Sequence, residues 1–192
     1  MIKFRRILAA PLLLATFTAF AVVGLGLACG TDEPSVVSSG SSGGVERVVD
    51  DARIYSLNDV MAAGAKAPKE YDVTELPGAV SAWRVIFQQK DFEVRLYPDH
   101  GIAVGQGTEW ADAATGEDAV VVGDDVRWQE GARDRRQCNR AASTPHSGCN
   151  YTARYGDYII LGNMILMCEG ANSEEALKSC RYFIDQMDSS SS

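Results

Sequence analysis

The most constraining stretch of this sequence is a pair of strand-forming runs near its C-terminal end. Residues 151–161 are rich in β-branched and aromatic residues, residues 164–168 are apolar throughout, and only Gly162 and Asn163 separate the two runs. A two-residue turn with a glycine is typical of a tight β-hairpin. Both runs are apolar at consecutive positions, so each strand would be buried on both faces. The sequence therefore predicts a hairpin of two central strands.

A helix is expected directly after this hairpin. Asn172 and Glu175 are spaced as an N-cap and its capping-box partner. Downstream, apolar residues recur at helical spacing on one stripe. This stripe contains Ala176, Leu177, Cys180, Phe183, Ile184 and Met187.

The same order of elements occurs earlier in the chain. Residues 92–97 alternate apolar and polar side chains, as a half-buried strand does, and residues 80–88 carry an apolar face. Asp99 can cap a helix that runs to Thr115 and ends at Gly116. The pattern predicts a second hairpin followed by a helix.

Two shorter elements complete the predicted order. We expect a helix over residues 57–65 and an extra hairpin over residues 120–128. The principal order, α-ββα-ββα, predicts an α+β fold of two layers. Its antiparallel sheet would have about four strands, with helices mainly on one face. Residues 45–188 have the length of a single domain.

The N-terminal residues resemble the signal sequence of a bacterial lipoprotein. Three basic residues precede an apolar run over residues 7–28. The segment from Leu25 to Cys29 resembles a lipobox, in which a peptidase cuts before a cysteine that receives the lipid. The usual leucine three positions before the cysteine is Gly26 here.

This resemblance implies an address outside the cytoplasm. Residues 1–28 would be the signal peptide, and residues 29–44, rich in Ser and Gly, a flexible linker that begins at the lipidated Cys29. The domain would then be anchored to the cell membrane and face its extracytoplasmic side, with residues 189–192 as a disordered tail. The alternative is an uncleaved anchor, because 22 mostly apolar residues can cross a ~30 Å hydrocarbon core.

The charge balance excludes one class of partner. The formal net charge is −8, and loss of residues 1–28 removes three positive charges and no negative ones, which gives −11. A chain this acidic does not attract nucleic acid or an anionic membrane surface through bulk electrostatics. We expect contact with the membrane through the lipid on Cys29, and no nucleic-acid partner.

Four further cysteines favour two disulfides in an oxidising location. A zinc site would need close pairs such as C-x2-C, which these spacings do not provide, so no metal is expected. One cysteine ends the second central strand and another lies on the stripe of the last helix. The predicted pairs are Cys168 with Cys180, and Cys138 with Cys149.

Six arginines make the segment over residues 127–154 positively charged within an acidic chain. Their planar guanidinium groups could recognise a phosphate, a carboxylate or an acidic glycan. The alternative is a solvated loop whose arginines pair with acids elsewhere in the domain. Arg154 is one of the six, and the candidate anion-binding residues are the other five, Arg127, Arg133, Arg135, Arg136 and Arg140.

The motifs predict no catalytic site. Ser143, His146 and Asp134 could be combined into a triad, but no nucleophile elbow surrounds them. No phosphate loop, metal-binding helix or coenzyme fingerprint occurs, so no cofactor is expected. Three tryptophans either line a ligand pocket or pack into the core: Trp83, Trp110 and Trp128.

We therefore expect a non-enzymatic binding or interaction module whose partner is an unknown ligand or an envelope protein. The alternatives are a hydrolase of the cell envelope and a structural or assembly lipoprotein without a small ligand.

Overall fold

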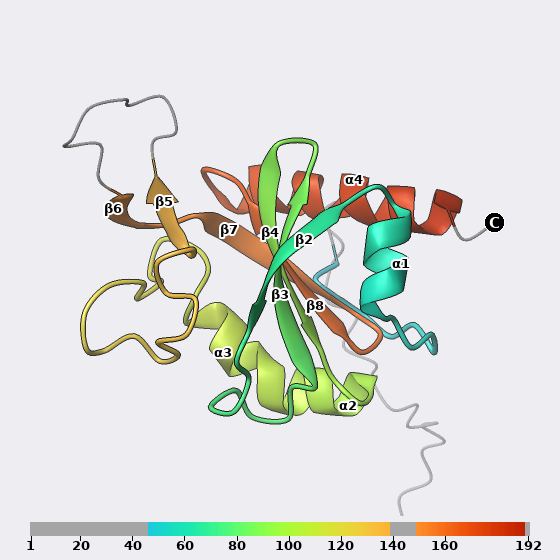
Figure 1. Cartoon of the computed structure of the whole chain (residues 1–192), viewed down its shortest axis with the longest axis horizontal. Coiled ribbons are helices and arrows are strands. Elements are labelled where there is room, and N and C mark those ends of the chain that lie inside the picture. The colour runs from blue at the N-terminus through green and yellow to red at the C-terminus, as the bar shows by residue number, and fades with distance from the viewer. Residues whose placement is uncertain (1–45, 139–148, 191–192) are drawn as a thin grey trace, which may run out of the picture. The chain divides into compact units, whose positions relative to one another are not determined.

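The centre of the molecule is a six-stranded sheet (Figure 1). It is seen in a computed structural model that describes residues 46–138 and 149–190. Its strands are β1 (Val48–Val49), β2 (Lys66–Tyr71), β3 (Ser81–Phe87), β4 (Lys90–Leu96), β7 (Tyr155–Leu161) and β8 (Met164–Glu169). Their order across the sheet is β1-β7-β8-β4-β3-β2. The β1–β7 pair is parallel and the other pairs are antiparallel.

The predicted central hairpin is confirmed. Every residue of β7 is buried, and β8 is buried as far as Cys168. Gly162 takes a φ of +52° in the turn, which an L side chain rarely adopts. The Asn163 side chain fixes the turn, because its amide accepts from the Tyr55 backbone N–H at 2.7 Å and donates to the Tyr97 carbonyl at 2.8 Å.

The first part of the predicted run over residues 151–161 leaves the main sheet. It belongs to β6 (Cys149–Ala153), which pairs with β5 (Arg136–Cys138) in a separate two-stranded sheet. The chain passes from β6 to β7 at Arg154.

Helices cover both faces of the sheet. On one face lie α1 (Leu57–Ala62) and α4 (Ser173–Ser190). On the other lies a helical segment of α2 (His100–Ile102), the π-helical turn η1 (Ala103–Gly107) and α3 (Thr108–Asp112). Neighbouring residues of β8 point to opposite cores, with Leu166 toward α4 and Ile165 toward η1.

The fold is α+β, but the predicted two-layer arrangement of four antiparallel strands is wrong. The sheet has six strands, includes a parallel pair and is flanked by helices on both sides. The central strands explain the difference, because strands that are apolar on both faces need cover on both faces. The expected hairpin over residues 120–128 does not form, and this segment consists of turns and bends.

The last helix forms where the sequence predicts it, but it continues to Ser190 and so includes the first two residues of the expected tail. The Asn172 side-chain oxygen accepts from the Glu175 backbone N–H at 3.0 Å, and all six residues of the predicted stripe are buried. The Cys168–Cys180 disulfide forms as predicted, with Cα atoms 5.6 Å apart, and joins β8 to α4.

The helical segment on the other face begins at the predicted cap. The Asp99 carboxylate accepts from the Ile102 backbone N–H at 2.8 Å. Close packing accounts for one of its glycines, because a Cβ at Gly107 would meet the Ile165 side chain and would lie 2.7 Å from the Tyr97 hydroxyl. Gly116 ends the region with a φ of +82°.

Candidate functional site

A buried cluster of charged side chains lies on the polar face of β4. Glu93 and Arg95 are two residues apart and therefore share this face. Their side chains are 0% and 1% exposed. One carboxylate oxygen of Glu93 accepts from Arg95 Nε and the other from Arg135 Nε, both at 2.8 Å. The expectation that β4 is half-buried is wrong. The segment over residues 113–135 covers the charged face of β4, and its Arg135 supplies a positive charge that pairs with Glu93.

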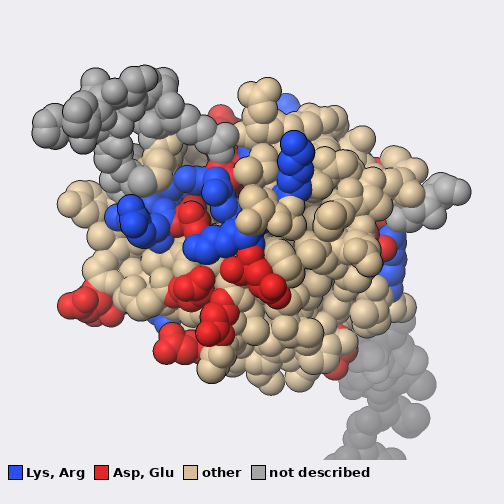
Figure 2. Space-filling model, viewed as in Figure 1, with Lys and Arg blue, Asp and Glu red and all other residues tan. Residues whose placement is uncertain are grey.

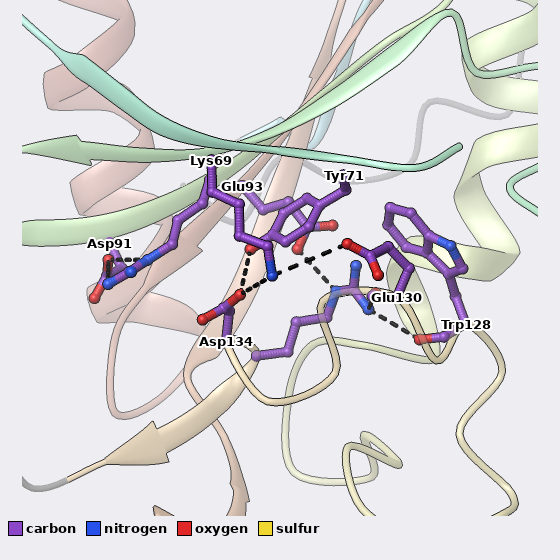
Figure 3. Close-up of polar contacts among 9 residues, drawn as sticks. Lys69, Tyr71, Asp91, Glu93, Trp128, Glu130 and Asp134 are labelled. Atoms are coloured by element: carbon purple, nitrogen blue, oxygen red, sulfur yellow. Dashed lines mark hydrogen bonds and ion pairs between the residues drawn. The ribbon is translucent and has the colours of Figure 1, made fainter. Parts of the chain in front are cut away.

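Arg135 links this covering segment to the sheet, since it donates both to Glu93 on β4 and to the segment's own backbone. Figure 3 labels its partners Glu93, Trp128 and Glu130. Its Nη1 donates to the carbonyls of Trp128 at 3.0 Å and Glu130 at 2.8 Å. Its guanidinium carbon lies 4.1 Å from the centre of the Trp128 ring and 5.6 Å from that of Tyr71. One side chain therefore organises a loop that has no strands of its own.

A second buried carboxylate lies further along the same face. Asp91 accepts from Arg84 through Nε at 3.0 Å and Nη2 at 2.8 Å, and its other oxygen accepts from Arg154. The backbone N–H of Asp91 donates to Glu169 at 2.6 Å. This group links β3 and β4 to the junction between β6 and β7.

The charged face reaches solvent at Lys69 and Asp134, beside the buried ring of Tyr71. Asp134 accepts from Lys69 Nζ at 3.0 Å and from the Tyr71 hydroxyl at 3.3 Å. Figure 2 shows acidic and basic side chains gathered next to one another on this side of the molecule. Such partly exposed pairs contribute little to stability individually.

The protonation states in the cluster are set by their neighbours. Burial alone would raise the pKa of Glu93, but the charges and hydrogen bonds of Arg135 and Arg95 outweigh burial and hold it below its usual value. Burial, with the negative charges of Glu93 and Asp134, raises the pKa of Tyr71 far above its usual value. Glu93 is thus an anion and Tyr71 a neutral donor at neutral pH. The cluster is suited to hold the covering segment rather than to transfer protons.

A separate cleft of about 560 Å³ opens at the N-terminal end of α4. Gly156 shapes it, since a Cβ there would lie 2.5 Å from the Asn172 carbonyl oxygen. The lining is formed by three glycines, two alanines and several polar residues: Gly116, Glu117, Gln137, Thr152, Ala153, Tyr155, Gly156, Gly170, Ala171, Asn172, Ser173 and Glu174.

The electrostatics of this cleft disfavour an anion. A helix N-terminus carries a partial positive charge. Here, however, the Asn172 side chain already accepts from the Glu175 backbone N–H, and the Ser173 hydroxyl donates to Asp157. The exposed carboxylates of Glu117 and Glu174 also line the cleft. Thr152 donates to the side-chain oxygen of Gln137 at 3.1 Å, which adds a polar pair to the wall.

The predicted anion-binding arginines lie in different environments. Arg127 pairs with Glu109 at 2.5 Å, Arg133 is exposed, Arg135 is buried on Glu93, and Arg136 is partly buried. Arg140 lies outside the described residues. Arg154, the sixth arginine of this region, pairs with Asp91. Of the five arginines that the structure describes, three have acidic partners within the domain, and a role in anion binding stays a prediction.

The three tryptophans also lie in different environments. Trp128 is buried against Tyr71, with ring centres 5.9 Å apart, whereas Trp83 and Trp110 are partly buried beside two different cores. His100 Nδ1 lies 2.8 Å from the Gly162 carbonyl oxygen, which gives it a structural contact at the central turn.

Several predicted residues lie outside the described part of the chain. They include Cys29, Ser143 and His146. The register of β5 and β6 sets Cys138 opposite Cys149, as their predicted bridge requires. The Cys149 side chain is not among those described, so this bridge stays a prediction.

Sequence patterns did not identify Asp91 and Glu93 as partners of the arginine-rich segment, or Arg95 as a second arginine on Glu93. A signal was present, since three alternating positions of one strand carry charged side chains, two acidic and one basic. The same alternation is typical of a solvent-facing strand, and only the fold distinguishes the two.

The fold and the two sites define an α+β domain with a mixed sheet between two helical layers, in which a charged strand face is covered by a loop. The chain belongs to a family of unknown function (DUF6810), which matches residues 56–189 and so extends from the start of α1 nearly to the end of α4. No curated protein and no solved structure matches the chain. Within residues 46–138 and 149–190, no helix has the length and apolar character needed to cross a membrane.

Proposed function

We propose that this protein is a lipid-anchored, extracytoplasmic binding module that acts without catalysis. The cleft at the N-terminal end of α4 would hold the ligand, and the lipid on Cys29 would attach the domain to the cell membrane. The lipobox-like residues around Cys29 support the anchor. The cleft itself is the observation that carries the binding function.

The size and lining of the cleft suggest the class of ligand. A volume of about 560 Å³ is in the range of small-molecule sites. The glycines and alanines of its wall allow a ligand to approach the backbone closely. Gln137 and Thr152 add a polar pair to the wall, while Glu117 and Glu174 repel anions. A polar small molecule that is neutral or cationic fits this lining best.

A thermal-shift screen of neutral and cationic polar compounds on the full chain tests the proposal. A ligand at one hundred times its dissociation constant should stabilise the protein by about 2.7 kcal/mol. The variant Ala171→Phe places a bulky ring in the cleft at an exposed position and should abolish that shift.

Ala62→Phe is the matched control, because Ala62 is exposed on α1 and does not line the cleft. It should bind as the wild type does. Hits that stabilise Ala171→Phe as strongly as the wild type, or a screen in which only anions bind, would contradict the proposal.

A further inference from the structure

A small cavity lies between the polar face of β4 and its covering segment. The volume open to the centre of a water-sized sphere is about 10 Å³, so the cavity has room for one water molecule or a slightly larger ion. Much of its wall is apolar, with alanines, valines and two tryptophans. The three charged side chains that line it are all arginines: Arg95, Arg127 and Arg135.

Three residues of this wall each have a buried N–H group without a protein partner. They are Arg95 at Nη1, Arg135 at Nη2 and Trp128 at Nε1. The side chains of both arginines are at most 2% exposed, and Trp128 is 3% exposed. A buried donor without an acceptor is destabilising, and more so when it is charged. Three such donors around one cavity indicate an acceptor inside it.

The charge of the cluster indicates what kind of acceptor fits. Arg95 and Arg135 share the single carboxylate of Glu93, so the buried group carries one excess positive charge. Both guanidinium groups lie near the Trp128 ring, at 5.2 and 4.1 Å, and the ring face offsets part of that charge. Arg127 is neutralised by Glu109 at the surface.

We infer that this cavity binds a small monovalent anion of about the size of chloride, held by the N–H groups of Arg95, Arg135 and Trp128. Such an anion balances the excess charge, whereas a water molecule supplies an acceptor but no charge. The small volume favours a monatomic anion over phosphate, sulfate or a carboxylate. The site uses only Arg135 of the arginines suggested by the sequence, and it is independent of the cleft at α4.

Bromide is a direct probe of this site, because it resembles chloride in size and scatters anomalously. Crystals of the protein grown in sodium bromide should show an anomalous peak in the cavity, within hydrogen-bonding distance of Arg95, Arg135 and Trp128. A water molecule or empty density there, without an anomalous signal, would overturn the inference.

A solution experiment tests the same site with the full chain. At constant ionic strength, replacing gluconate by chloride should raise the melting temperature, since gluconate is too large for the cavity. Trp128→Phe keeps an aromatic ring but removes the indole N–H. It should raise the apparent dissociation constant for chloride about tenfold, the loss expected for one hydrogen bond to a charged group.

Trp83→Phe is the matched control, because Trp83 packs against the opposite core. It should keep the chloride dependence of the wild type. A wild-type melting temperature that does not respond to chloride would refute the site, and this result does not depend on whether Trp128→Phe folds.

Discussion

Glu93 on β4 is the residue that holds the segment over residues 113–135 against the charged face of this strand. It is fully buried, and each of its carboxylate oxygens accepts from a different buried arginine. Removing one partner of a buried ion pair costs more than the pair contributes, because the remaining charges stay buried. We therefore expect Glu93→Gln to lower the free energy of unfolding by about 3 kcal/mol, measured by urea denaturation.

Glu117→Gln is a suitable comparison, because it makes the same chemical change at an exposed position. It should alter stability by less than about 0.5 kcal/mol. Equal stabilities of the two variants would mean that the buried cluster is not held by its ion pairs.

The lowered pKa values of Glu93 and Asp134 predict how the free energy of unfolding depends on pH. The pKa of Glu93 is below its usual value because Arg135 and Arg95 outweigh burial, and that of Asp134 is lowered because the hydrogen bond and charge of Lys69 outweigh its burial. A carboxyl group with a lowered pKa in the folded state contributes stability above its unfolded pKa. This contribution is lost as the pH falls through the folded pKa. Unfolding experiments from about pH 6 to about pH 3 should show falling stability, with a shallower slope in Glu93→Gln.

At the scale of elements, the Cys168–Cys180 bridge joins a central strand to the helix that covers it. The two residues are 12 apart in sequence, and a loop of that length is worth about 3 kcal/mol in the chain-entropy model. Replacing both by Ala should lower the melting temperature strongly. The matched double replacement of Cys138 and Cys149 should cost less, because β5 and β6 form a separate two-stranded sheet. The reverse order in calorimetry would contradict this expectation.

The elements that could be predicted from sequence are those with a single strong pattern. The apolar runs of β7 and β8 and the stripe of α4 each indicate their own burial, and the cysteine pair follows from their adjacency. By contrast, β2 is an edge strand with mostly exposed residues, so no alternation marks it. The contact of Glu93 with Arg135 joins residues 42 apart, and no local pattern reports such a contact. The cleft likewise is assembled from turns of several separate segments.

For the whole molecule, the proposed lipid anchor would set how far the domain can lie from the membrane. Residues 30–44 can span at most about 50 Å when fully extended. If Cys29 carries the lipid, the cleft at α4 must meet its ligand close to the membrane surface. Under this proposal, anchoring would limit the pool of ligands to those found in the envelope.

Cys29→Ser tests this arrangement directly. Acylation needs the thiol, and the peptidase acts on the acylated precursor, so the variant should retain residues 1–28 and incorporate no labelled palmitate. The wild type should be shortened, labelled and recovered with membranes. Ser35→Ala, a change in the linker that spares the cysteine, should behave as the wild type. If Cys29→Ser is processed and exported normally, Cys29 is not the anchor. If the wild type itself keeps residues 1–28 without a label, the apolar run is an uncleaved anchor and the domain is held to the membrane by its chain rather than by a lipid.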